Sequence, residues 1–472
     1  MDRKIAWEEY SVKQEKELET LSAEYIDFIS KCKTERECID HIVEAAEAAG
    51  FKELEELVKN KTTVKTGDRI YSVWMNKSIA LFEIGSRPLE EGMNILGAHI
   101  DSPRLDVKQN PLYEDGGFAY LDTHYYGGIK KYQWVTLPLA LHGVIVKKDG
   151  TTVLVNVGEN EEDPVFFVSD LLIHLASEQL EKKGNKVIEG EALDIIIGNK
   201  PLVLKKTAKV NEEAKKKKDK VKSNILEILK KLYDVSEEDF VSAELEVVPA
   251  GKAREAGFDR SMILGYGHDD RVCAFPSYKA VTASGGFEKT ACCILVDKEE
   301  IGSVGATGMK SRFFEYMVAQ IVELMGDYSE LKLKRILANS CMLSSDVSAG
   351  FDPIYAAQFE KKNACYLGKG VVFNKYTGSR GKSGSNDANA EYIAYLRNIM
   401  DESKVYYQTA ELGKVDAGGG GTIAYIMALY GMNVIDSGIP VLNMHAPWEC
   451  VSKADIYEAF RCYKAFLKGS GI

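Results

Sequence analysis

The residues with the clearest chemical potential are two adjacent glutamates, Glu299 and Glu300, which follow an apolar run at 291–296. A strand that ends in two carboxylates can direct them at different atoms, so that one binds a metal ion while the other carries a proton. Further nitrogen and oxygen donors lie near other apolar runs, namely His99, Asp269, Asp346 and His445. Donors of these types suit zinc and similar ions. The pattern therefore predicts a hydrolase that uses two metal ions.

Asp101 follows His99 by two residues, so both side chains point to the same face if the strand continues. Asp101 can then accept the second ring N–H of His99 and raise its basicity. Asp269, in the sequence Asp269-Asp270-Arg271, could bridge two ions with its two oxygens. Each motif alone also fits a structural role, such as an Asp that caps a turn or a helix. Their joint occurrence is what indicates a site.

The elements expected around these residues alternate between strands and helices, which predicts an α/β fold. Apolar runs predict strands at 78–83, 94–100, 291–296, 333–343 and 440–444. Helical periodicity predicts two helices in 8–49, broken near 31–34, and others at 312–325, 388–400, 421–430 and 453–468. We expect a three-layer α/β/α domain with a mixed sheet, whose site lies at the carboxyl ends of strands.

The segment 108–238 has a different character, with Gly-rich and Tyr-rich turns and strand-like runs at 139–147 and 152–157. A helix-like stretch follows at 171–182, and then the run Lys215–Lys218, which is typical of a solvated face. None of the proposed ligands lies here. We therefore expect a β-rich insertion, 108–238, within a catalytic domain formed by 1–107 and 239–472.

Composition limits the remaining possibilities. The net charge of -11 argues against a dedicated nucleic-acid binder. The 9 cysteines show no C-x-x-C spacing, which fits reduced thiols better than a disulfide framework. The N-terminus lacks the apolar core of a secretory signal, and no stretch is apolar and long enough to span a bilayer. These features predict a cytoplasmic protein that binds neither membrane nor nucleic acid.

Four motifs together resemble a known family: Gly97–Arg104 (GAHIDSPR), Gly267–Arg271 (GHDDR), Asp297–Ser303 (DKEEIGS) and Met444-His445. They are similar to the aspartyl aminopeptidase and aminopeptidase I family of co-catalytic zinc metallopeptidases. The resemblance extends over nearly the whole chain, including the position of the insertion. It implies an aminopeptidase that removes the first residue from peptides with a free N-terminus and uses two zinc ions per subunit, with cobalt or manganese as substitutes.

The resemblance also implies a role for each residue. His99 and Asp346 would bind one zinc ion, Glu300 and His445 the other, and Asp269 both. Glu299 would be the general base, and Asp101 would support His99. The insertion would form a dimerisation domain, dimers would assemble into a tetrahedral dodecamer, and His174 would reach a neighbouring subunit's active site. Lys375, in a glycine-rich basic loop, would contact an acidic N-terminal residue.

The sequence departs from the eukaryotic pattern of this family in two places. Val347 and Ser348 follow Asp346, and Asp270 stands where many members have Asn. The chain is closer to a bacterial branch, so a strict preference for N-terminal Asp or Glu does not follow. The alternatives are a broad aminopeptidase for Leu or Met, a dipeptidase or an N-acyl amino-acid deacylase. A metal-stabilised scaffold without turnover is disfavoured, because it would need the ligands but not Glu299.

Overall fold

The protein was analysed as a computed structural model, which describes residues 4–203, 219–283 and 285–471. It divides into two compact units. The first unit contains the chain up to Ser102, Ala253–Met444 and the chain from Trp448 onward. The second contains Pro103–Lys252 and His445–Pro447. The run Lys215–Lys218 lies outside the described residues.

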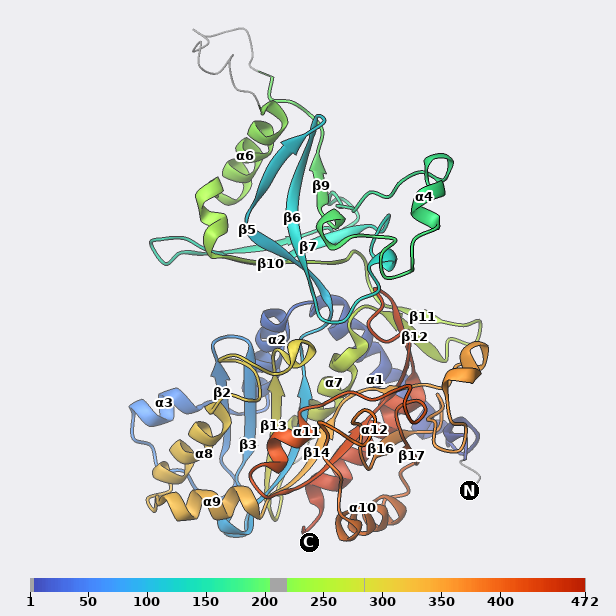
Figure 1. The fold of residues 1–472 in the computed structure, drawn as a ribbon. Helices are drawn as coiled ribbons and strands as arrows, with labels where there is room; N and C mark the ends of the chain where they lie inside the picture. Colours follow the sequence, from blue (N-terminus) through green and yellow to red (C-terminus); the bar gives the residue numbers. More distant parts are fainter. Residues whose placement is uncertain (1–3, 204–218, 284, 472) are drawn as a thin grey trace. The chain divides into compact units, whose positions relative to one another are not determined.

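The centre of the first unit is a nine-stranded mixed sheet (Figure 1). In spatial order its strands are β1 (Lys52–Glu53), β2 (Arg69–Trp74), β3 (Ser78–Glu83), β13 (Thr290–Val296), β4 (Met93–His99), β14 (Cys341–Ser345), β18 (Asn433–Gly438), β16 (Val371–Asn374) and β17 (Tyr407–Ala410). The central strands β13, β4, β14 and β18 run parallel to one another. Strands β3 and β16 pair antiparallel to β13 and β18, so the predicted mixed sheet is confirmed.

The apolar strands are buried on both faces because their side chains alternate between two cores. On β13, Ala291, Cys293 and Leu295 enter one core. Cys292, Ile294 and Val296 enter the other. A strand covered on both faces shows a continuous apolar run rather than a polar alternation. This double burial explains why 291–296 could be recognised as a strand.

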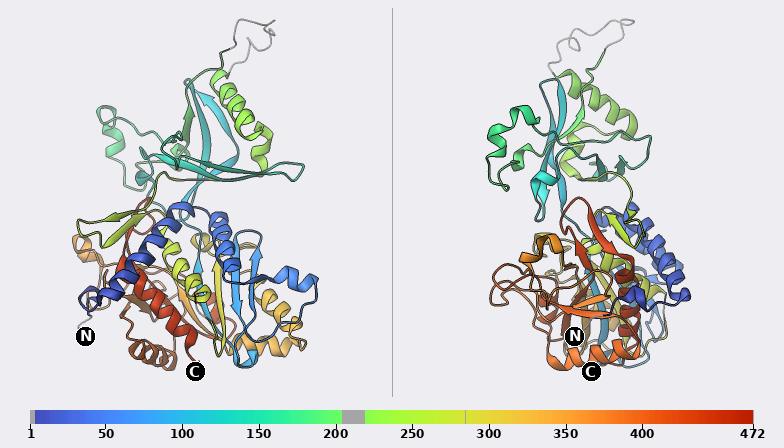
Figure 2. Two further views of the ribbon diagram at one scale, coloured as in Figure 1. Left: turned by 180° about the vertical axis from the view of Figure 1, so that it is seen from behind. Right: turned by 90° about the vertical axis from the view of Figure 1, so that its right-hand side faces the viewer.

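Helices form the outer layers, as expected for the three-layer fold. One core includes residues of α1 (Val12–Lys31), α2 (Glu35–Ala48), α7 (His268–Thr282), α10 (Ala390–Glu402) and α12 (Lys453–Lys468). The other includes residues of α3 (Leu54–Lys59), α8 (Phe313–Leu324), α9 (Glu330–Ala338) and α11 (Ala424–Ala428). Figure 1 views the sheet from the side of α8 and α9, and Figure 2 (left) from the side of α1, α2 and α12. None of the described helices has the length and apolar character needed to cross a membrane.

Shorter elements complete the first unit. A small sheet orders β11 (Arg254–Ala256), β12 (Met262–Gly265), β20 (Glu449–Ser452), β19 (Pro440–Leu442) and β15 (Ser348–Ala349). The 3-10 helices are η1 (Ala6–Glu8), η2 (Leu89–Glu91), η7 (Glu299–Ile301) and η8 (Pro353–Gln358). Of these elements, η7 carries both glutamates singled out from the sequence.

Capping residues explain where the first helices begin. Ser11 and Thr34 each accept a hydrogen bond from the backbone three residues on, in two capping boxes. The second box starts α2 and accounts for the predicted break near 31–34. The predicted strand 333–343 is wrong in its first part, where α9 forms before β14 begins at Cys341. Leu333, Ile336 and Leu337 are buried at helical spacing, and Ser329 caps the helix.

The second unit is built on a six-stranded sheet in which all neighbours are antiparallel. Its order is β8 (Thr152–Val157), β7 (Leu139–Val146), β10 (Ala243–Pro249), β5 (Arg104–Asp115), β6 (Phe118–Tyr126) and β9 (Ile195–Gly198). Helix α6 (Lys220–Tyr233) contacts β5, β6 and β9. Because β5 and β10 are part of this ladder, the unit extends beyond 108–238 at both ends.

The helix predicted at 171–182 is wrong as a single element. The chain instead forms η4 (Ile173–Leu175) and a short α4 (Ser177–Leu180). The other 3-10 helices of this unit are η3 (Lys131–Gln133), η5 (Gly190–Ala192) and η6 (Glu237–Ser242). Five apolar side chains are exposed here, those of Leu171, Leu172, Ile173, Leu175 and Leu180. Among the described residues they therefore pack against no core that would favour a continuous helix.

The central position of β13 predicts a large effect of truncation there. Ile294→Ala should lower the free energy of unfolding by about 2–5 kcal/mol, because it opens a cavity in a fully buried core. Urea denaturation should show a lower midpoint at an unchanged slope. Leu331→Ala, at an exposed position of α9, is the control and should change stability by less than about 0.5 kcal/mol. Equal effects of the two substitutions would contradict the proposed core.

Candidate metal centre

The sheet brings the predicted residues to one edge. His99 is the last residue of β4 and lies opposite Val296 at the end of parallel β13. On the other side of β4, Gly97 lies opposite Ser344 of parallel β14. Glu299 and Glu300 follow β13, and Asp346 follows β14. The carboxyl ends of these three neighbouring strands therefore present the predicted side chains together.

Two groups of donor atoms form at this edge. His99, Asp269 and Glu300 offer one nitrogen and two carboxylate oxygens that lie within 4.8 Å of one another. His99, Glu299 and Asp346 form a second group of the same kind. The two groups share His99 and are buried or half-buried. Both groups differ from the expected ligand sets. The first joins His99 with Glu300, which the family resemblance assigns to different ions. The second includes Glu299, for which the sequence predicts proton transfer rather than metal binding.

Asp101 supports both sides of this site. Its Oδ1 lies 3.2 Å from His99 Nδ1, which also lies 3.0 Å from the Asp101 carbonyl oxygen. Its two oxygens also accept the backbone N–H groups of Glu299 and Glu300, each at 3.1 Å. Asp101 is completely buried. One carboxylate thus fixes the orientation of the imidazole and the turn that carries the two glutamates, and this second role was not predicted.

Two residues that sequence reasoning missed fix the backbone at Asp269. The Ser102 hydroxyl donates to the Asp269 carbonyl oxygen at 2.6 Å. The Asp269 N–H donates to Glu449 Oε2 at 3.0 Å. Ser102 lies within the His99–Pro103 motif and could have been noticed there. Glu449 follows no motif that the sequence analysis used.

The basic residue of the Asp269-Asp270-Arg271 motif has a structural role. Arg271 is completely buried, and its guanidinium donates to the carbonyl oxygens of Ile100 and Lys33 at 3.0 and 2.9 Å. Gly267, with φ of 76°, precedes this motif, and a Cβ there would lie 2.3 Å from Arg271 Nη1.

His268 lies between Gly267 and Asp269 and also has a structural role. It forms a hydrogen bond of 2.6 Å with the Tyr25 hydroxyl, and burial lowers the pKa of His268 to about 3. His268 is therefore neutral and belongs to the core.

The electrostatics of the cluster fit a bound cation. Burial raises the pKa of Asp346 well above its usual range, and the charge of Glu299 raises it further. Burial acts in the same direction on Asp270. For His99, burial disfavours the charged ring, but hydrogen bonds to Asp101 and Asp269 outweigh it and raise the pKa. Without a cation the cluster attracts protons, and a divalent ion among imidazole and carboxylate donors can replace them.

The remaining predicted residues belong to neither donor group. His445 belongs to the second unit, where its Nδ1 lies 2.9 Å from the Gly128 carbonyl oxygen, and neither donor group includes it. His174 is exposed in η4 of the same unit. In the first unit, Lys375 follows β16, where its ammonium pairs with Asp387 Oδ1 at 2.5 Å.

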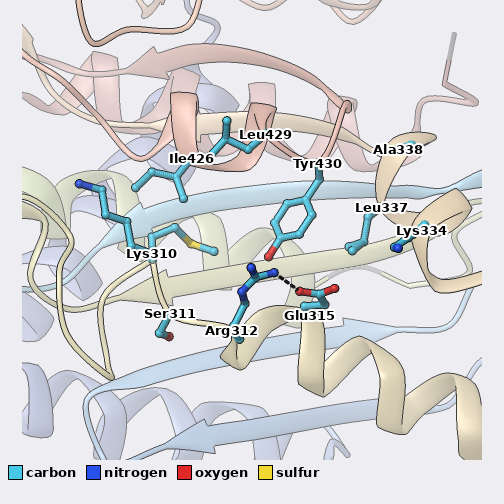
Figure 3. Close-up of a pocket in the computed structure, with 11 residues that line it drawn as sticks. Lys310, Ser311, Arg312, Glu315, Lys334, Leu337, Ala338, Ile426, Leu429 and Tyr430 are labelled. Atoms are coloured by element: carbon cyan, nitrogen blue, oxygen red, sulfur yellow. Dashed lines mark hydrogen bonds and ion pairs between the residues drawn. The ribbon is translucent and has the colours of Figure 1, made fainter. Parts of the chain in front are cut away.

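The first unit also contains a cavity that none of these residues lines. It has a volume of about 560 Å³ and lies among α8, α9 and α11 (Figure 3). Its walls carry an Arg312–Glu315 ion pair of 3.0 Å, with Ile426 and Leu429 on α11 and just after it. Neither donor group contributes to its lining. The metal centre is therefore identified by the chemistry of the strand ends and not by this cavity.

Comparisons with known proteins agree with this fold. A family model described as aminopeptidase I zinc metalloprotease (M18) matches residues 28–467. A probable M18 family aminopeptidase 1 of Clostridium acetobutylicum is 63% identical over 464 residues, 98% of each chain. The chain belongs to the M18 family, and its reaction is therefore that of an aminopeptidase, a hydrolase of peptide bonds.

Two solved structures show the same fold. The crystal structure of an M18 family aminopeptidase from Thermotoga maritima superimposes with a TM-score of 0.91 at 43% identity and covers 99% of both chains. The crystal structure of aminopeptidase I from Clostridium acetobutylicum superimposes with a TM-score of 0.90 at 59% identity. The match covers 99% of this chain and all of that chain. The fold class expected from the sequence is thereby confirmed.

The double role of Asp101 can be tested by one conservative substitution. Asp101→Asn replaces an acceptor oxygen by an NH₂ group, which cannot accept the hydrogen bond of a backbone N–H. We expect zinc affinity to fall about 10–100-fold, as when a group that orients a ligand is lost. Competition with a chelating dye measures this affinity directly. Asp401→Asn, on the exposed side of α10, is the control, and equal affinities of both variants would contradict the role of Asp101.

Proposed function

We propose that this aminopeptidase uses two zinc ions per subunit, with cobalt or manganese as substitutes. His99 and Asp346 would bind one ion, Glu300 and His445 the other, and Asp269 both. The observation that carries the proposal is that four of the five proposed ligands, namely His99, Asp269, Glu300 and Asp346, belong to the two donor groups at this edge of the sheet, although the groups combine them in other pairs. His445 is supported as a ligand only by the Met444-His445 motif, which matches the pattern of the family.

Zinc and the side chains of the site would then have separate roles in the reaction. Bound zinc would polarise the scissile carbonyl and lower the pKa of the attacking water. Glu299 would take the proton from this water at its carboxylate and transfer it to the leaving amine. Asp101 would hold His99 and the glutamate turn in place through its buried hydrogen bonds. The buried surroundings would strengthen each of these electrostatic contacts.

The choice of N-terminal residue depends on whether Lys375 can meet a substrate carboxylate. Its ammonium is already paired with Asp387, which also pairs with Lys382 at 3.0 Å. An acidic side chain would have to displace Asp387 from Lys375. Because this pair is about half exposed, displacing it would cost little. The broad alternative, in which neutral residues such as Leu or Met are removed, is instead favoured by the departures from the eukaryotic pattern at Asp270, Val347 and Ser348.

We also propose that the protein is a cytoplasmic homo-oligomer, following the tetrahedral dodecamer that the family resemblance implies. The second unit would be the dimerisation domain, and its exposed His174 would reach a neighbouring subunit's active site. The exposed apolar residues around His174 support this assignment, with Ile173 at 67% and Leu175 at 66% exposure. Adjacent large apolar side chains at such exposure are typical of surfaces that another chain covers.

Glu299→Gln tests the general base. The amide cannot accept the proton, so kcat should fall about 10²–10⁴-fold while the fold is retained. Amino-acyl anilide hydrolysis measures the rate, and elemental analysis measures zinc. Glu288→Gln, an exposed position just before β13, is the control and should remain active. Near-normal turnover of the Glu299 variant would remove it from the mechanism.

A substrate panel tests specificity. Tripeptides that begin with Asp, Glu, Leu, Met or Lys should be hydrolysed in a chelator-sensitive manner, with Leu and Met preferred. Lys375→Ala should leave the Leu and Met rates within about 2-fold, because Lys375 is paired within the protein. A preference for Asp or Glu that disappears in the Lys375 variant would establish the acidic specificity instead. N-acetylated tripeptides should resist hydrolysis, which separates an aminopeptidase from a deacylase.

A further inference from the structure

The loop that carries Glu299 and Glu300 closes on itself through a buried ring of hydrogen bonds. The Asp297 N–H donates to Ser78 Oγ at 3.3 Å, and the Ser78 hydroxyl donates to the Thr307 carbonyl oxygen at 2.7 Å. The Thr307 hydroxyl in turn donates to Asp297 Oδ2 at 2.6 Å. Residues 297 and 307 lie on either side of the two glutamates. The ring therefore joins both ends of the loop to the start of β3.

All three members of this ring are buried, with exposed fractions of 1% for Asp297, 0% for Ser78 and 5% for Thr307. Buried hydrogen bonds to a carboxylate are among the strong ones, and leaving such a group unsatisfied is costly. Lys298 also pairs with Asp297 Oδ2 at 2.7 Å. The base of the loop is thus a fully connected polar group inside an apolar sheet, which favours a single arrangement.

Further contacts beside the ring also fix the two ends of the loop. Asp297 and Gly308 form a parallel β-bridge, and Trp74 Nε1 donates to the Ala306 carbonyl oxygen at 2.9 Å. Gly308 has no room for a side chain, because a Cβ there would lie 2.5 Å from the Ser303 carbonyl oxygen. The tip of the loop, in contrast, is exposed at Ile301 and Val304. The position of the glutamates is therefore set at the base of the loop and by Asp101, rather than by contacts at the tip.

We propose that Asp297, Ser78 and Thr307, with Trp74, are positioning residues that determine where Glu299 and Glu300 lie. This inference rests on the proposed roles of the two glutamates. It predicts that removing a hydrogen bond of the ring displaces the metal ligand Glu300 and the general base Glu299 at the same time. A displacement of about 1 Å can reduce a rate about 10²-fold.

Thr307→Val is the direct test, since it keeps the shape of the side chain and removes only the hydroxyl. We expect kcat to fall at least about 10-fold with little change in KM, and zinc affinity, measured by dye competition, to fall as well. Thr307→Ser restores the hydroxyl and should recover both quantities. Ser78→Ala removes the hydroxyl that links the other two residues and should reproduce both losses.

Thr290→Val is the matched control. Thr290 is 1% exposed, lies at the opposite end of β13, and its Oγ1 accepts a hydrogen bond from the Gly85 N–H at 3.1 Å. Its substitution should lower thermal stability without changing kcat or zinc affinity. If Thr307→Val behaves like Thr290→Val, the ring is merely structural and the inference is wrong.

Two further outcomes keep the inference separate from the proposed function. If Thr307→Val does not fold, Trp74→Phe is the test in its place. This substitution removes only the indole N–H that donates to the Ala306 carbonyl oxygen, at an exposed edge. Unchanged kcat and unchanged zinc affinity in the Trp74→Phe variant would overturn the proposal. A wild-type protein without zinc-dependent peptide hydrolysis, or a fully active Glu299→Gln variant, would contradict the proposed function instead. An inactive Glu299→Gln variant beside a normal Thr307→Val variant would overturn the positioning role alone.

Discussion

The mutual repulsion of carboxylates at one edge of the sheet is the constraint on which the rest of this structure depends. Asp101, Asp269 and Asp270 are buried, and half-buried carboxylates lie beside them at Glu299, Glu300 and Asp346. Buried charges of one sign are costly unless hydrogen bonds or cations compensate them. The protein supplies backbone N–H donors to Asp101 from the glutamate turn and one to Asp270 from His99. Bound cations would provide the remaining compensation.

The three-layer architecture is what makes such a cluster possible. Helices on both faces bury β13, β4 and β14 completely, so these parallel strands end together in surroundings from which water is largely excluded. The side chains that follow these strands then converge on one small region. An open sheet face would expose the same residues to water, where each contact would be weaker.

The parts of this arrangement that could be predicted are those encoded locally. The apolar runs at 94–100 and 291–296 identified strands, and the acidic and histidine residues after them identified the site. The run 333–343 misled because a helix with a buried apolar face is followed by a buried strand after only two residues, Asn339 and Ser340. The contacts of Glu449 with Asp269 and of Thr307 with Ser78 could not be predicted, because these partners lie 180 and 229 residues apart and no spacing rule connects them. The pairing of Lys375 with Asp387 depends on how its loop folds, which side-chain type does not reveal.

Two consecutive glutamates can serve different purposes only if the backbone turns between strand and helix. Lys298 and Gly302, on either side of η7, have φ angles of 68° and 93°, so the chain changes direction before and after the pair. In a continued strand, Glu299 and Glu300 would point to opposite faces of the sheet, and one of them would leave the site. The turn instead places Glu300 in one donor group and Glu299 in the other. The residues of this turn do not favour its backbone conformation on their own. Contacts with Asp101 on one side, and with the ring of Asp297, Ser78 and Thr307 on the other, stabilise it.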